Sequence, residues 1–237
     1  CVQTGLEYSG SNLDTLFAQR KNIVSPYFLR LVKDILRFNK EAQRDLDSGA
    51  LAVDMTLGEY LQRNGYSEGF KRHYLIPMTA AIWSASTSVV MGFPLVFFVR
   101  FFKNHGLLSV NDRPQWRTII GGSRDYLGPL TRTFSDRIRT GCAVSEVCRS
   151  DRGVRVTSAG FGEELFVQVV FATHSDQALA LLQDAAPAER EVLQAVPYQM
   201  NDVVLHTDER LLPRLKKTWS CWNYLLDSYQ QDRAVLS

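Results

Sequence analysis

The sequence has few cysteines, and none of them is spaced for a metal site. Four occur among 237 residues, with no Cys-x-x-Cys pair. Cys142 and Cys148 lie six residues apart on one expected strand, which is about 20 Å at the rise of a strand, so they cannot form a disulfide while that strand persists. Free thiols in a cytoplasmic protein are therefore favoured over a metal-binding or disulfide role.

Long apolar runs and long runs of one charge are also absent. The longest apolar stretch, residues 93–102, contains Arg100 and is shorter than the ~20 residues that span a bilayer. The 27 Lys and Arg against 25 Asp and Glu give a net charge of +2, which argues neither for nor against a nucleic-acid partner, and none is expected. The four histidines are scattered, which argues against a metalloenzyme or a Ser–His–Asp hydrolase. Apolar residues are plentiful: 45% are hydrophobic and 11% aromatic, enough for one sizeable core or two small ones.

The first half of the sequence is patterned as helices. Ser25 is a capping residue directly before Pro26, and this pair predicts an amphipathic helix over residues 27–46. Residues 56–59 read Thr-Leu-Gly-Glu, a capping box that predicts a short helix. Residues 68–74 are expected to form another helix that ends before Pro77.

Two apolar segments allow a structural or a functional interpretation. Small residues surround Trp83 between residues 78 and 86, and such a segment packs closely against a neighbouring helix, a substrate or a flat ring. Residues 94–103 predict a helix with aromatic side chains, Phe98 among them, on both sides. Core packing is favoured, with the wall of an apolar tunnel or a patch on a membrane surface as alternatives. His105 and Gly106 are expected to cap its end.

The second half is patterned as strands followed by a helix. Residues 138–148 and 154–157 predict two strands joined by a hairpin turn, and residues 165–171 predict a buried strand. A helix is expected to begin behind Thr173 or Ser175. Small residues between a buried strand and a helix start allow a ligand to approach the backbone.

This order resembles the second half of the FAD-binding domain of the flavin-containing amine oxidoreductase family. The closer resemblance is to a bacterial branch of predicted NAD/FAD-binding proteins whose plant relatives are fused to cyclopropane fatty acid synthases. The segments that carry it, in order along the chain, are residues 5–10, 36–39, 104–108, 113–117, 121–124, 172–178, 201–208 and 222–224.

The resemblance implies an α/β (α+β) protein, part of a two-domain FAD-binding fold of the glutathione-reductase and amine-oxidase type. Residues 1–120 would form a mainly helical substrate domain, residues 121–186 the second part of an incomplete FAD domain, and residues 187–237 a return to the sheet of the substrate domain. The family's Gly-x-Gly-x-x-Gly loop is missing. The chain is therefore expected to be an interior fragment of a longer polypeptide that does not hold FAD tightly by itself.

Several positions can be carried over from the family. Val144 resembles the valine whose backbone contacts the adenine, and Ala172 and Thr173 resemble the small residues that pass the pyrophosphate and ribityl groups. His174 either faces the cofactor or caps the helix. FAD would be bound non-covalently, since no cysteine or histidine suits a covalent anchor.

The expected strand over residues 201–207 resembles the one that bears the amine-oxidase lysine. No lysine occurs there, and Asn201 or Asp202 stands near its position; these two are the catalytic candidates. The candidate substrate-binding residues are Trp83, Phe98, His105, His206 and Trp222.

The resemblance and the apolar segments together predict an FAD-dependent oxidoreductase that acts on an apolar, lipid-like substrate. The alternatives are a flavin amine oxidase for small amines and a non-catalytic lipid-binding or partner module that keeps the oxidase fold. The protein is expected in the cytoplasm or at a membrane surface, without a transmembrane segment. No oligomeric state is indicated.

Overall fold

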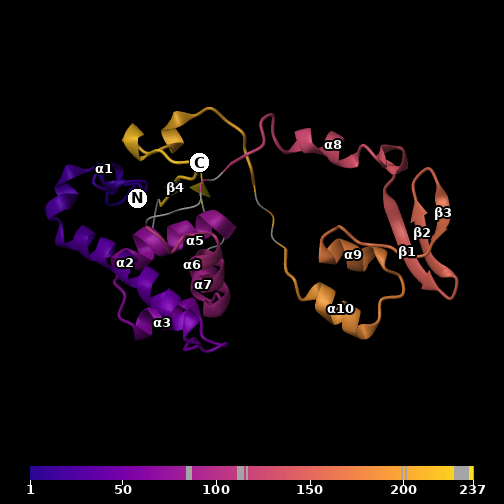
Figure 1. The fold of residues 1–237 in the computed structure, drawn as a ribbon, viewed down its shortest axis with the longest axis horizontal. Coiled ribbons are helices and arrows are strands. Elements are labelled where there is room, and N and C mark those ends of the chain that lie inside the picture. Colours follow the sequence, from indigo (N-terminus) through magenta and orange to yellow (C-terminus); the bar gives the residue numbers. More distant parts are fainter. Residues whose placement is uncertain are drawn as a thin grey trace. The chain divides into compact units, whose positions relative to one another are not determined.

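The computed structural model of the chain describes residues 1–83, 87–110, 115, 117–198, 200, 202–226 and 235–236. It contains helices and a small antiparallel sheet, so the expected mixed α+β class is confirmed. The chain divides into two compact units (Figure 1). The first comprises Cys1–Trp116 and Val203–Ser237, and the second Arg117–Asp202. Within the described residues, no helix is long and apolar enough to cross a bilayer.

The first unit is mainly helical. Its helices are α1 (Leu13–Leu16), α2 (Pro26–Asp47), α3 (Leu57–Arg63), α4 (Glu68–Phe70), α5 (Ile76–Trp83), α6 (Thr87–Met91) and α7 (Leu95–Asn104). Short 3-10 turns occur at Arg20–Val24, Glu209–Leu211 and Lys216–Thr218, and a π-helical turn at Lys71–Leu75. The strands β4 (Tyr224–Leu225) and β5 (Val235–Leu236) form an antiparallel pair.

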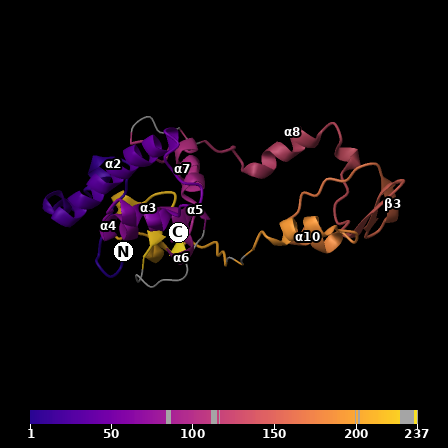
Figure 2. The ribbon, with the colours of Figure 1, turned by 90° about the horizontal axis from the view of Figure 1, so that it is seen from below.

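Helix α2 begins where the sequence predicted. The Ser25 hydroxyl accepts a hydrogen bond from the Phe28 N–H (3.4 Å), and Pro26 occupies the first turn, where a missing N–H costs nothing. Phe28, Leu31 and Phe38 are fully buried along one face. Helix α2 packs against α4 and α7, as the turned view also shows (Figure 2). Helix α2 is therefore a main contributor to the first unit's core.

Pro77 does not end a helix, so the expected boundary before it was wrong. The helical chain continues from the π-helical turn at Lys71–Leu75 into α5, with Pro77 in its first turn. A proline cannot donate to the carbonyl four residues earlier, which belongs to His73. The Tyr8 hydroxyl donates to that carbonyl instead (2.6 Å). A tertiary hydrogen bond thus replaces the helical one.

The second unit contains a three-stranded antiparallel meander and short helices. The strands are β1 (Val144–Ser150), β2 (Gly153–Ser158) and β3 (Gly162–Phe166), in the order β1-β2-β3. The helices are α8 (Leu127–Thr131), α9 (Ser175–Leu181) and α10 (Pro187–Gln194), with 3-10 turns at Ser123–Tyr126 and Ser135–Arg137. Helix α9 contacts both α10 and β1.

The hairpin and the helix behind Thr173 are confirmed, but the strand boundaries differ from those expected. The first strand begins at Val144 and not at residue 138, and the third ends at Phe166 and does not extend to residue 171. Residues 167–171 have no ladder partner among the described residues, and Val167 and Val170 are exposed. The expected strand over residues 201–207 is also missing: residue 201 lies outside the described residues, and residues 202–207 form no strand. A β-branched sequence forms a ladder only beside another strand.

Candidate functional site

A cavity of ≈ 1030 Å³ opens in the first unit. Its volume is at the upper end of the range of ligand pockets. Its walls come from the N-terminal segment, from α2 and α5, from residues 107–110 and from the C-terminal segment 210–226. Parts of the chain about two hundred residues apart therefore meet around it.

Aliphatic side chains of two helices form much of the lining. Val32, Ile35 and Leu36 lie on α2, and Ala81 and Ile82 on α5. The α2 residues follow the spacing of one helix face, which is set by the helical period. The sequence segment around residue 81 was expected to pack on a helix, a substrate or a flat ring, and it borders this cavity.

A buried histidine stands in the polar part of the wall. His73 is 8% exposed, and its Nδ1 lies 2.8 Å from the Tyr27 hydroxyl. Burial lowers the pKa of the His73 imidazole to about 4, and the positive charges of the N-terminal ammonium group and of Arg72 act in the same direction. The pKa of the Tyr8 hydroxyl is raised, first by burial, so it stays a donor to the His73 carbonyl. At neutral pH the wall carries a neutral imidazole.

Asn39 interrupts the aliphatic face of α2. It lines the cavity and is 6% exposed, and its Oδ1 has no hydrogen-bond partner among the described residues. A buried amide without a partner is destabilising by ~1–3 kcal/mol. The unpartnered atom is the amide oxygen, so it can accept a hydrogen bond from a donor.

The charges around the cavity are mostly positive. The cationic lining residues are Arg20, Lys21, Arg72, Arg210 and Arg214, and the one carboxylate in the lining is Glu7. Three of the arginines pair with acids outside the lining, namely Asp14, Glu68 and Asp208. Lys21 and Arg214 make no side-chain ion pair within the described part of the chain. Two cations without a side-chain ion pair among the described residues therefore border the cavity.

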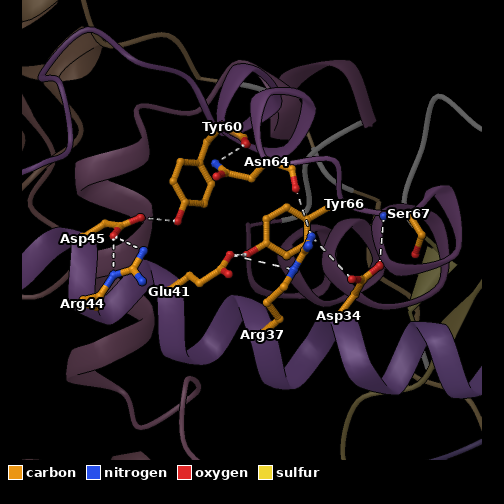
Figure 3. A network of polar contacts seen from close by, with 9 residues as sticks. All are labelled: Asp34, Arg37, Glu41, Arg44, Asp45, Tyr60, Asn64, Tyr66 and Ser67. Atoms are coloured by element: carbon orange, nitrogen blue, oxygen red, sulfur yellow. Dashed lines mark hydrogen bonds and ion pairs between the residues drawn. The ribbon is translucent and has the colours of Figure 1, made fainter.

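A network of polar contacts on another side of α2 holds this helix in position against its neighbours (Figure 3). The buried Asp34 carboxylate accepts from the Ser67 N–H (3.0 Å) at the start of α4 and pairs with Arg37 (3.5 Å). The Arg37 guanidinium lies 4.0 Å from the centre of the Tyr66 ring, and the Tyr66 hydroxyl donates to Glu41 (2.7 Å). These bonds hold α2 against the start of α4 and the residue before it, Tyr66, and so set the position of its cavity face.

Three of the expected substrate-binding residues pack on one another and not on the cavity. The Trp83 ring centre lies 4.6 Å from that of Phe101 and 6.2 Å from that of Phe98, and Phe98 is fully buried. The His105 ring stacks on Phe101 (4.1 Å), and its Nδ1 lies 3.0 Å from the Phe101 carbonyl, as the expected cap would. The described lining includes none of these three.

The other two expected substrate-binding residues lie in the C-terminal segment. Trp222 lines the cavity with its ring 65% exposed. His206 is exposed, and its Nδ1 accepts from the Asp208 N–H (3.0 Å). Trp222 is therefore the expected substrate contact that the structure brings to the cavity.

The expected cofactor positions all belong to the second unit. Val144 opens β1 and is 38% exposed, and Ala172 and Thr173 are exposed. The ring of His174 stacks on Tyr198 with centres 4.3 Å apart. Thus His174 supports the start of α9, while the small residues before it leave the backbone uncovered.

The catalytic candidates stand at the end of the second unit. Asn201 lies outside the described residues, and Asp202 is exposed. Exposure spares the carboxyl group of Asp202 the free-energy cost of burial.

Sequence reasoning missed the polar residues of the cavity. Asn39, His73, Lys21 and Arg214 were not singled out. The asparagine had a detectable signal, because it follows Val32 and Ile35 at helical spacing on an apolar face. Lys21 and Arg214 had no such signal in the sequence, because only folding brings their neighbours together.

No protein-family model matches the chain, and no curated protein matches it. Among the described residues, no group of three or more His, Cys, Asp or Glu could hold a metal ion. The geometry of the two units therefore carries the functional argument.

Proposed function

We propose that the protein is an FAD-dependent oxidoreductase acting on an apolar, lipid-like substrate. The observation that carries the proposal is the large cavity in the first unit, with aliphatic walls from α2 and α5. Binding in such a cavity is driven by the burial of apolar surface, and a few polar groups fix orientation. A small polyamine would call for acidic side chains, and Glu7 is the one carboxylate in the described lining.

The second unit supports the cofactor part of the proposal. FAD would supply a ring atom that accepts a hydride. The backbone of Val144 would contact the adenine, and the backbone at Ala172 and Thr173 would pass the pyrophosphate and ribityl groups, as the resemblance implies. Their exposure and the small side chains at 172 and 173 suit close approach of a ligand. Binding would be non-covalent.

Asn201 and Asp202 are proposed to act beside the reacting atoms. Either side chain could hold a water molecule or the substrate in position through a hydrogen bond. Asp202 is exposed, so a water molecule or a ligand can reach its side chain. The protein would work in the cytoplasm or at the surface of a membrane, where such substrates are found.

The test begins with the absorbance of the protein expressed from its complete gene and purified without added cofactor. The proposal expects the two flavin absorbance bands, release of FAD on acid precipitation, and bleaching of the flavin by lipids in the absence of oxygen. Replacing Asn201 and Asp202 together by alanine should slow that bleaching.

Other outcomes contradict the proposal in distinct ways. A folded, colourless protein that binds lipid would be the non-catalytic module. A yellow protein reduced by polyamines and by no lipid would be an amine oxidase. An unchanged rate in the Asn201 and Asp202 double variant would contradict the catalytic placement alone.

A further inference from the structure

We infer that the cavity of the first unit binds a single-chain amphiphile with an anionic head, whose head lies at Lys21 and Arg214 and whose chain runs along α2 to Asn39. The inference rests on the proposed function and names its substrate class: a long-chain carboxylate bearing a second oxygen far from the carboxylate.

The segments that carry the two cations are linked through Glu7, which also lines the cavity. The Glu7 carboxylate accepts from the backbone N–H groups of Arg214 (3.0 Å) and Leu215 (2.9 Å), and the Glu7 N–H donates to Gln19 (3.3 Å), two residues before Lys21. Glu7 thus draws the two segments together just before α2 begins. The side chains of Lys21 and Arg214 are exposed and form no ion pair within the described residues. Glu7 supplies one negative charge there and the two side chains supply two positive charges, so an anionic head would balance the remaining one.

The hydrocarbon chain of the ligand would lie on the aliphatic faces of α2 and α5. Val32, Ile35 and Leu36 of α2 line the cavity together with Ala81 of α5. Leu36 is 51% exposed and Trp222 is 65% exposed, so apolar surface is left uncovered at the cavity. A ligand chain would remove this surface from water, which strengthens binding by about fourfold per buried methylene.

Asn39 gives the far end of the ligand a polar contact. It follows Pro26 by thirteen residues, roughly 20 Å along the helix axis. Its Oδ1 is buried without a partner among the described residues, and its side chain lines the cavity. A hydroxyl group of the ligand would donate a hydrogen bond to this oxygen, whereas a purely hydrocarbon chain would leave it unsatisfied.

Binding of four probes to the flavin-free 237-residue chain tests the inference: hexadecanoate, 16-hydroxyhexadecanoate, hexadecanol and hexadecyltrimethylammonium. Titration calorimetry should give the tightest binding for 16-hydroxyhexadecanoate and at least a tenfold weaker affinity for the cationic probe. Replacing Lys21 and Arg214 by glutamine should weaken hexadecanoate binding about tenfold and leave hexadecanol unchanged.

The matched control replaces Lys33 and Lys40 by glutamine. Both are exposed on α2 and neither is in the lining, so the same change in net charge should leave every affinity unchanged. Asn39→Leu should remove the preference for the hydroxylated acid and keep binding of hexadecanoate. Thermal unfolding of each variant shows whether it remains folded.

Three results would overturn the inference. These are equal affinity for the anionic and cationic probes, undiminished hexadecanoate binding after loss of Lys21 and Arg214, and no preference for the hydroxylated acid. Anionic-lipid binding by a protein whose complete form is colourless would contradict the proposed redox function and leave the inference standing. Reduction of the flavin by neutral lipids alone would support the proposed redox function and contradict the inference of an anionic ligand.

Discussion

Protonation of His73 should make the first unit less stable in mild acid. Its ordinary pKa is 6.5, and burial lowers this pKa to about 4 in the folded protein. Between these two values the unfolded chain binds a proton that the folded chain does not, so stability falls as pH falls through this window. Above pH 6.5 both states are neutral, and the effect is absent.

The size of the effect follows from the two pKa values. A difference of one unit corresponds to about 1.4 kcal/mol, so the full loss below pH 4 is about 3 kcal/mol, and the loss at pH 5 is about 2 kcal/mol. The groups around the His73 ring do not oppose this lowering of its pKa. Tyr27 and Tyr8 contact the residue through hydroxyl groups, and Arg72 is positive, so none of these three supplies a negative charge to stabilise an imidazolium.

Urea denaturation of the natural chain and of His73→Gln at a series of pH values measures this difference. Subtracting one stability curve from the other removes the contributions of the carboxylates that both chains share. The stability advantage of the natural chain should shrink by about 2 kcal/mol between pH 7.5 and pH 5. His206→Gln is the control, because that histidine is exposed. A difference that stays constant within about 0.5 kcal/mol across this range would refute the reasoning.

Two further variants test the packing of the units. Asp34→Ala should lower the free energy of unfolding by about 2–4 kcal/mol in urea, because it removes the Ser67 contact and leaves the Arg37 charge without this partner; a loss below about 0.5 kcal/mol would mean that Asp34 acts as a surface residue. Gly153→Ala should open the meander of the second unit, since Gly153 has φ +134° and an added Cβ would lie 2.4 Å from the Phe166 carbonyl oxygen. Hydrogen exchange should then speed up in β2 and β3 and stay unchanged in α2, and full protection in β3 would contradict the argument.

The helices of the first unit were largely predictable because their signals are local. Ser25 and Pro26 fix the start of α2, and the Thr56–Glu59 capping box forms as expected, with the Glu59 carboxylate accepting from the Thr56 N–H (2.8 Å). Pro77 was misjudged because its tolerance depends on the Tyr8 hydroxyl, sixty-nine positions earlier in the chain. A local rule fails where a distant group takes over the lost hydrogen bond.

The strands were less predictable because each strand forms its hydrogen bonds with another segment of the chain and not within itself. The turn before Gly153 marked the β1–β2 hairpin correctly, since a tight turn is a local event. Residues 165–171 have an apolar composition typical of a buried strand, yet the ladder ends at Phe166. Composition indicates that a segment can be a strand, and only the neighbouring chain decides where the pairing stops.

Trp83 and Phe98 were poor markers of the cavity for a physical reason, whereas Trp222 lies in its lining. Rings such as Trp83 and Phe98 are stabilised by packing on other rings. A helix rich in them therefore fills the space beside it with its own side chains. A cavity persists where a side chain is too short to fill the space, as at Ala81, or where a polar group faces apolar neighbours, as at Asn39. In this chain, a single asparagine within an aliphatic helix face was therefore a better sequence sign of the cavity than the phenylalanines of α7.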